Sequence, residues 1–222
     1  MNRRDLLKGL AGIPVLGAIA YGAWKHKKYE NLFKSNIKEA VNLSAGAPAL
    51  TKYSNKEPKL RIGIIGFGGR GEHLLRAAGF AHPDVIENWK NQSLIKKDDQ
   101  RYTDYLNQED LNLEINGVCD LFSKRTDRAV AASANKGREG INGKFSTPAK
   151  RYSNYQDLLS ADDIDAVIIG TPDHWHTEIA IEAAKKGKHV YVEKAMTRTI
   201  DETFRLREAV RNSKIVFQLG HQ

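Results

Sequence analysis

Short apolar runs and longer amphipathic segments follow one another through residues 59–222, and this pattern predicts strands and helices in alternation. The predicted strands are residues 60–65, 113–119, a short piece near 152, 165–170, 189–192 and 215–219. The predicted helices are residues 72–79, 123–136, 155–159, 177–186 and 200–212. Such alternation is typical of an α/β fold, here a doubly wound (Rossmann), mostly parallel sheet.

The segments before residue 59 do not follow this pattern. Residues 1–23 carry Arg3 and Arg4 near their start, followed by a short Gly/Ala-rich apolar run. This arrangement resembles a twin-arginine (Tat) export signal. The resemblance implies export to the periplasm, and contact with a membrane only through this signal; an uncleaved amphiphilic anchor is the alternative. Residues 24–58 are rich in Lys, Asn and Ser and are interpreted as a linker before the domain 59–222.

Within the domain, residues 82–112 are an inserted segment that a plain βαβ unit does not need. They are polar, with scattered aromatic residues such as Trp89 and Tyr105. We expect a loop with some helix, serving as surface decoration or, alternatively, as a lid or an oligomer contact.

Composition and charge exclude several classes of protein. Hydrophobic residues make up 41% of the 222-residue chain and charged residues 28%, a globular composition rather than a disordered one. Residues 1–34 hold seven basic and two acidic residues, so they contribute +5 of the net +8 and leave only +3 elsewhere. We therefore expect no nucleic-acid partner. A single cysteine, Cys119, excludes an intrachain disulfide framework, and no His spacing indicates a metal site.

The clearest motif lies between the first predicted strand and helix and reads Gly66, Phe67, Gly68, Gly69, Arg70 and Gly71. A strand, a G-x-G-x-x-G turn and a helix form the context in which a dinucleotide is bound. The glycines permit the tight turn, the approach of the diphosphate and close packing of the helix, whose N-terminus favours an anion. A glycine turn without a ligand is the alternative.

Polar residues recur where the predicted strands end. Asp120 ends the second strand, residues 171–176 follow the fourth, Glu193 and Lys194 end the fifth, and residues 221–222 end the sixth. Because parallel strands end at one edge of a sheet, these residues should line the cleft in which such folds bind ligands. Lys194 is the candidate for chemistry, since a desolvated amine beside a cationic nicotinamide could exchange a proton with a substrate hydroxyl.

The choice of cofactor turns on Asp120. An acidic residue at the end of the second strand hydrogen-bonds the adenine ribose of NAD. Lys124 and Arg125 come next and could hold the 2′-phosphate of NADP. We expect NAD, with NADP left open, because the carboxylate would repel that phosphate.

Residues 171–176 (Thr-Pro-Asp-His-Trp-His) and 187–194 (Gly-Lys-His-Val-Tyr-Val-Glu-Lys) resemble the family of glucose–fructose oxidoreductase, inositol dehydrogenase and MocA, the Gfo/Idh/MocA oxidoreductases. The resemblance, which covers residues 59–222, implies a hydride transfer between NAD(P) and a sugar, polyol or related hydroxyl. It implies catalytic roles for Lys194 and His176, with His176 also at the cofactor. It further implies cofactor contacts for Thr171, Pro172, Asp173, Glu193 and Lys194.

The sequence departs from the family pattern in two places. Ala195 replaces the proline of E-K-P, a proline that often follows a cis peptide bond, so the loop could be set differently. The family's second α/β domain, which carries substrate-binding residues, is expected after the sixth strand, where this sequence stops. We therefore expect this chain to supply the cofactor-binding half, with little turnover alone, and the full-length protein to be a homo-oligomer.

Two other functions remain open. Some relatives cleave glycosides by transient oxidation with tightly held NAD, and they also carry Tat signals; their lysine is often replaced, so Lys194 favours the dehydrogenase. A non-catalytic nucleotide-binding module is the third interpretation, and it predicts that Lys194 is dispensable.

Overall fold

The computed structural model describes residues 24–28, 58–135 and 147–221, in a chain that divides into two compact units between Lys52 and Tyr53. In the second unit the strands are β1 (Leu60–Ile65), β2 (Leu113–Cys119), β3 (Lys150–Arg151), β4 (Ala166–Ile169), β5 (His189–Glu193) and β6 (Phe217–Gly220). The helices are α2 (Gly69–Ala77), α3 (Pro83–Ile95), α4 (Arg101–Leu106), α5 (Ser123–Ser133), α6 (Tyr155–Leu159), α7 (Asp173–Lys185) and α8 (Ile200–Asn212).

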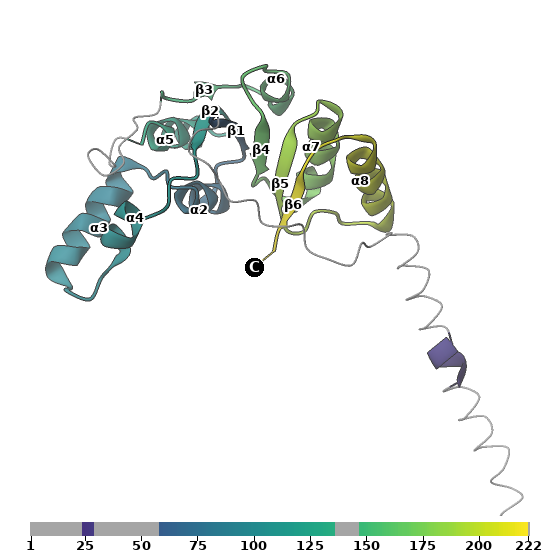
Figure 1. Cartoon of the computed structure of the whole chain (residues 1–222), viewed down its shortest axis with the longest axis horizontal. Coiled ribbons are helices and arrows are strands. Elements are labelled where there is room, and N and C mark those ends of the chain that lie inside the picture. The colour runs from purple at the N-terminus through teal and green to yellow at the C-terminus, as the bar shows by residue number, and fades with distance from the viewer. Residues whose placement is uncertain (1–23, 29–57, 136–146, 222) are drawn as a thin grey trace, which may run out of the picture. The chain divides into compact units, whose positions relative to one another are not determined.

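The strands form one six-stranded sheet in the order β3-β2-β1-β4-β5-β6, and every neighbouring pair is parallel (Figure 1). The order reverses between β1 and β4, which is the switch point of a doubly wound sheet. The predicted α/β Rossmann architecture is therefore confirmed.

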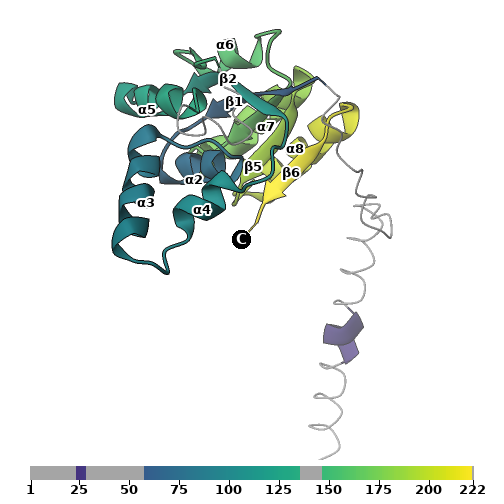
Figure 2. The ribbon, with the colours of Figure 1, turned by 60° about the vertical axis from the view of Figure 1, so that its left-hand side comes forward.

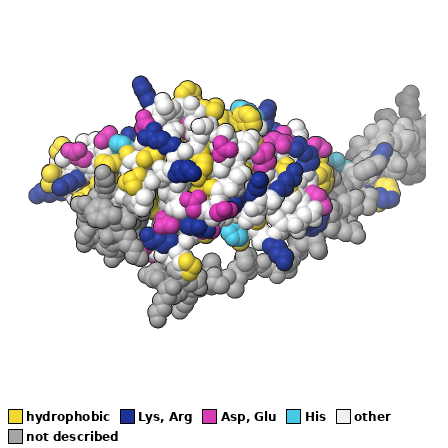
Figure 3. All heavy atoms as spheres, turned by 90° about the horizontal axis from the view of Figure 1, so that it is seen from above, with side chains coloured by type: hydrophobic (Ala, Val, Ile, Leu, Met, Phe, Trp, Pro, Cys, Tyr) yellow, Lys and Arg dark blue, Asp and Glu magenta, His cyan; other side chains and the backbone are white. Residues whose placement is uncertain are grey.

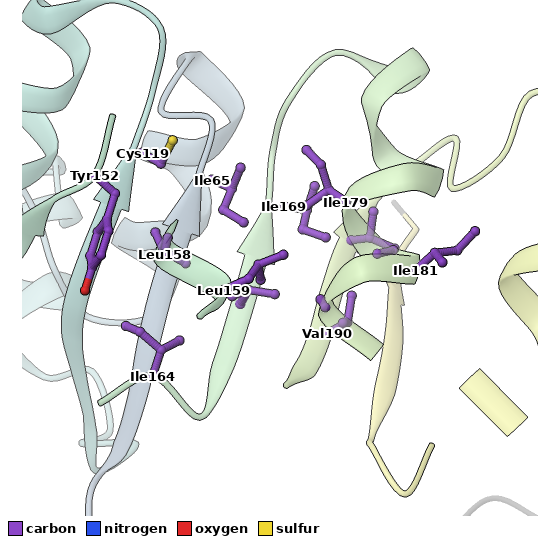
Figure 4. Packing of buried hydrophobic residues seen from close by; sticks show 14 of the residues in the cluster. Ile65, Cys119, Tyr152, Leu158, Leu159, Ile164, Ile169, Ile179, Ile181 and Val190 are labelled. Carbon is purple, nitrogen blue, oxygen red and sulfur yellow. The ribbon is translucent and has the colours of Figure 1, made fainter. Parts of the chain in front are cut away.

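Two hydrophobic cores lie on the two faces of this sheet, because side chains alternate along each strand. On β1, Ile65 belongs to the core formed with α6, α7 and α8, whereas Ile62 and Ile64 belong to the core formed with α2 and α5. Figure 4 shows the first of these cores, where Ile65 and Ile169 of the sheet face Ile179 of α7. Both faces are thus covered, as a parallel sheet requires.

A β-bulge interrupts the alternation on β2. Ile62 pairs with Ile115, but Gly63 pairs with Gly117, so Asn116 is the extra residue. Ile115 and Val118 consequently share one core although they are three residues apart. The paired glycines leave room for α6, because a Cβ on Gly63 would lie 2.6 Å from Leu158 Cδ2.

The inserted segment forms two helices, α3 and α4, which lie together beside α2 in both views (Figures 1 and 2). Tyr105 is 3% exposed, and its hydroxyl lies 2.8 Å from Asn135 Oδ1 and 3.2 Å from the Gly79 carbonyl oxygen. Gly79 and Asn135 follow the C-termini of α2 and α5, at the end opposite the glycine turn. The anchored end of the insertion therefore lies at the amino edge of the sheet, which argues against a lid over the cofactor edge.

The main difference from the predicted elements concerns α7. It begins at Asp173 rather than at residue 177, with Pro172 as its N-cap residue and an acidic residue in its first turn. The residues that were expected to form a loop after β4 therefore include the first turn of a helix, and His176 lies on that helix.

The face drawn in Figure 3 carries Lys and Arg side chains interspersed with Asp and Glu. No helix among the described residues is long and apolar enough to cross a membrane. The predicted export signal, residues 1–23, lies outside the described residues, as does most of the predicted linker 24–58, so export stays a prediction.

Candidate active site

The glycine turn connects β1 to α2 and touches the end of β4. Gly66 has φ +86°, and a Cβ there would lie 2.7 Å from the Thr171 nitrogen. A Cβ on Gly71 would lie 2.2 Å from the Gly66 carbonyl oxygen, so only glycine lets α2 start this close to the strand. The backbone conformation at Gly66 and the close contact at Gly71 explain why the first and third positions of the motif are glycine.

Asp120 joins the end of β2 to the same turn. Its Oδ2 accepts a hydrogen bond from the Phe67 N–H at 2.7 Å, and its Oδ1 accepts one from the Phe122 N–H at 2.9 Å. The Phe67 side chain is 3% exposed and packs in the core, so this residue meets the edge through its backbone alone. Asp120 therefore lies where a ribose acceptor is expected, with its carboxylate oriented by the backbone.

Arg70 links the glycine turn to the end of β5. Its Nη2 lies 2.9 Å from Glu193 Oε1, and the Glu193 side chain is only 5% exposed. The Tyr191 hydroxyl donates to the same oxygen at 3.3 Å. An acidic residue predicted beside the cofactor is thus paired with a cation from the phosphate-binding motif.

Lys194 follows directly and is exposed. Among the described residues its amine has no hydrogen-bond or ion-pair partner, so it is free to meet a ligand. The Lys194–Ala195 peptide bond is cis, although the proline of the family pattern is absent.

His176 is placed differently from the prediction. The ring is 1% exposed; Nδ1 lies 2.8 Å from the Ala195 carbonyl oxygen and Nε2 lies 2.8 Å from the Thr171 carbonyl oxygen. Both nitrogens are directed at backbone oxygens of the loops after β5 and β4, which leaves neither open to a substrate. This geometry favours a positioning role for His176 over the predicted catalytic one.

The neighbouring residue, Thr177, also contacts the loop after β5, although no sequence motif includes it. It is 2% exposed, and its hydroxyl donates to the Met196 carbonyl oxygen at 3.0 Å. Glu202 of α8 holds the same loop further along, because its Oε2 accepts from the Arg198 N–H at 2.5 Å and the Thr199 N–H at 3.2 Å. The capping box of Thr199 and Glu202 was a readable signal, whereas nothing in the sequence pointed to Thr177.

The remaining predicted residues of the β4 loop lie at the surface. Pro172 and Asp173 are exposed at the start of α7, together with His174 and Trp175. The Thr171 hydroxyl, by contrast, is buried and has no hydrogen-bond partner among the described residues. A buried hydroxyl beside the glycine turn is a group that a ligand would satisfy.

The turn leaves open space beside two of its glycines. A Cβ on Gly69 would meet nothing within 4 Å, and one on Gly68 would meet only the Arg125 guanidinium, at 3.7 Å. The first N–H groups of α2 have no partners within the helix and would face an anion there. Gly68, Gly69 and the unsatisfied Thr171 hydroxyl therefore fit the backbone-cradled diphosphate that the motif predicts.

Neither a reactive thiol nor a metal site is found among the described residues. Burial, with a smaller contribution from Asp120, raises the pKa of Cys119 to about 11, so the thiol is protonated at neutral pH. Among residues 24–28, 58–135 and 147–221, no group of three or more His, Cys, Asp and Glu side chains is arranged to hold a metal ion.

Comparison with known proteins agrees with this geometry. The Gfo/Idh/MocA family, described as an oxidoreductase family with an NAD-binding Rossmann fold, matches residues 60–221. A glycosyl hydrolase family 109 protein of Shewanella baltica (strain OS155) is 29% identical over 93% of this chain and 36% of its own length. An α-N-acetylgalactosaminidase of Shewanella oneidensis is 28% identical over the same shares.

A solved structure supports the fold. The WlbA dehydrogenase of Chromobacterium violaceum, crystallised with NADH and UDP-GlcNAcA, aligns with a TM-score of 0.51 at 19% identity, covering 74% of this chain and 36% of that one. The chain thus spans 36% of the length of the two curated relatives. The family match, the glycine turn and the residues gathered at the carboxyl edge show that the chain belongs to the Gfo/Idh/MocA family of NAD-binding oxidoreductases.

Proposed function

We propose that this chain binds NAD along the carboxyl edge of its sheet and forms the cofactor-binding half of an enzyme that oxidises a carbohydrate hydroxyl. The observation that carries the proposal is the Arg70–Glu193 ion pair, because it brings the glycine turn and the end of β5 together and puts both beside Lys194. The contact ties the phosphate-binding motif directly to the strand end that carries the candidate base.

Different residues of the chain bind different parts of the cofactor and the substrate. The backbone at Gly68 and Gly69 and the first N–H groups of α2 hold the diphosphate, while Asp120 accepts from the adenine ribose. Thr171 offers its hydroxyl at the centre of the edge. A bound nicotinamide would accept the hydride from the substrate's carbinol carbon, and the Lys194 amine would take the proton from the hydroxyl on that carbon, which leaves a carbonyl.

Gly68→Ala tests cofactor binding on this chain directly. Its Cβ would meet only the flexible end of Arg125, at 3.7 Å, so the variant should fold with an unchanged thermal midpoint. The methyl group would, however, occupy the space proposed for the diphosphate. Calorimetric titration should show NAD bound by the wild type and at least roughly tenfold more weakly by the variant, a loss of about 1.4 kcal/mol. Equal affinity in both proteins would refute the proposed position of the diphosphate.

A second candidate function is glycoside cleavage through transient oxidation, with NAD returned to its starting state in each cycle. It is favoured by the names of the curated relatives, a family 109 glycosyl hydrolase and an α-N-acetylgalactosaminidase. The free Lys194 amine favours net oxidation instead. Both candidates share the same hydride and proton transfers at this edge, and they differ only in the fate of the oxidised sugar and of the hydride.

Two assays on the full-length protein separate these candidates. Net oxidation releases NADH in proportion to the carbohydrate consumed, which is followed by absorbance. Glycoside cleavage releases nitrophenol from a nitrophenyl glycoside, such as the N-acetylgalactosaminide, without net NADH. Lys194→Ala should abolish net oxidation, whereas a non-catalytic module would tolerate the change.

A further inference from the structure

The segment after Lys194 is held by two helices. The first two turns of α7 hold its beginning, since His176 and Thr177 face the carbonyl oxygens of Ala195 and Met196. The start of α8 holds the rest through Glu202 and through the contact between the Thr197 and Thr203 hydroxyls, 2.8 Å apart. The backbone that follows Lys194 is therefore held in place, while the Lys194 amine itself has no partner among the described residues.

Thr177 is the hydroxyl on which this arrangement depends. It lies at 2% exposure beneath the loop, 3.0 Å from the Met196 carbonyl oxygen and 3.3 Å from Glu202 Oε2. A hydroxyl has one hydrogen to donate, and a partly buried carbonyl oxygen that loses its donor is unfavourable. Replacing the hydroxyl with a methyl group would free the Met196 carbonyl and place it against an apolar group.

We propose that Thr177 is a positioning residue that orients the Lys194 amine toward the nicotinamide end of the bound dinucleotide. Thr177 acts through the backbone of Met196 and touches neither cofactor nor substrate. The inference rests on the proposed NAD site, and it adds a residue that lies outside both family motifs, residues 171–176 and 187–194.

The test uses two ligands and one site-specific readout. ADP-ribose has the adenosine, diphosphate and second ribose of NAD but lacks nicotinamide, so the difference between the two ligands reports the nicotinamide end. Acetylation of each lysine by acetic anhydride is followed by mass spectrometry of the folded chain. Lys186, exposed at the far end of α7, serves as the internal reference.

In the wild type, NAD at about ten times its Kd should slow acetylation of Lys194 roughly tenfold relative to Lys186, and ADP-ribose should slow it much less. Thr177→Val should lose most of the protection by NAD while its affinity for ADP-ribose stays within about twofold. Thr177→Ser keeps the hydroxyl and should restore protection. Ser133→Ala, which removes another buried hydroxyl bonded to backbone, should leave protection unchanged.

The other possible outcomes also test the positioning role of Thr177. Full protection in folded Thr177→Val, or lost protection in folded Thr177→Ser, would overturn the positioning role. Should Thr177→Val fail to fold, the serine variant alone carries the test, because loss of protection there contradicts the proposal. If the wild type binds neither ADP-ribose nor NAD, the proposed function itself fails, which is a different result from an unprotected Lys194 in a protein that binds both.

Discussion

Arg70 Nη2 and Glu193 Oε1 lie 2.9 Å apart, so the arginine inside the glycine motif neutralises a carboxylate that is almost wholly buried at the end of β5. The pair joins the start of α2, which follows β1, to the end of β5, and β4 lies between these two strands in the sheet. Its energetic consequence can be measured, because a buried carboxylate that loses its cation keeps the desolvation cost without the compensation.

Arg70→Met should therefore lower the free energy of unfolding by about 1–3 kcal/mol, as expected for an unsatisfied buried group. Adding Glu193→Gln removes the charge that was stranded, so the double variant should be less destabilised than the sum of the single changes. Urea denaturation of the four proteins measures this coupling. Strictly additive effects would show that the ion pair contributes nothing to the fold.

Gly71→Ala should disrupt the fold itself. The new Cβ would lie 2.2 Å from the Gly66 carbonyl oxygen, and backbone on both sides would have to move, at a cost of about 1–3 kcal/mol or more. Gly69→Ala is the matched variant, since its Cβ would meet nothing within 4 Å. Thermal unfolding should show a lowered midpoint for the first and a near wild-type midpoint for the second. Comparable midpoints would contradict the close contact between α2 and the turn.

The high pKa of Cys119, about 11, predicts a thiol that resists alkylation in the folded chain. The thiolate is the reactive form, and at about pH 8 only roughly one thiol in a thousand would be ionised. Iodoacetamide should leave Cys119 unmodified over a time in which the urea-unfolded chain reacts fully, as mass spectrometry would show. Fast modification of the native protein would mean that the end of β2 opens readily.

The ion pair of Asp165 and Arg61 predicts part of the acid sensitivity. The Arg61 guanidinium donates to both Asp165 oxygens, at 2.9 and 2.6 Å, and lowers the pKa of this carboxyl in the folded state. A lowered folded pKa adds stability that is present above the unfolded value, about 3.9, and is lost as the pH falls through the folded value. Asp165→Asn should thus be less stable than wild type at about pH 6 and lose less stability between about pH 6 and pH 3. Parallel pH profiles from urea titrations would contradict this assignment.

The periodic pattern predicted the elements well where packing and local signals agree. Residues 200–212 and 113–119 form α8 and β2 with the predicted bounds. Apolar spacing and a capping box coincide in the first, and apolar residues mark the second. The start of α7 was misplaced, although a proline followed by an acidic residue is itself a helix-start signal. That signal lay inside a motif interpreted as a loop.

The candidate site was predictable as a set of positions but not as a set of contacts. Parallel strands bring their carboxyl ends to one edge, so the sequence order was enough to expect Asp120 and Lys194 there. The pairing of Arg70 with Glu193, the burial of His176 and the bond from Thr177 to the loop depend on side-chain directions between elements distant in sequence. Periodicity carries no information about these.

Tyr105→Phe tests whether the inserted helices α3 and α4 affect cofactor binding. It removes the hydroxyl that bonds Asn135 and Gly79, and it should lower the free energy of unfolding by about 1–2 kcal/mol. Since the anchor lies at the amino edge, NAD affinity measured by calorimetry should stay within about twofold of wild type. A marked loss of affinity in a folded variant would instead connect α3 and α4 to the ligand.

Leu158 fills the space that two hydrogen-bonded strands leave empty at Gly63 and Gly117, lying 2.6 Å from the place of one missing Cβ and 3.3 Å from the other. One helix side chain and two strand positions therefore share a single volume. Across the descent of this lineage, a methyl group gained at position 63 must be matched by a smaller residue at 158, whereas one gained at position 117 would first meet Tyr152, at 3.0 Å, and Ile164, at 3.2 Å. Homologous sequences should therefore show paired changes at positions 63 and 158.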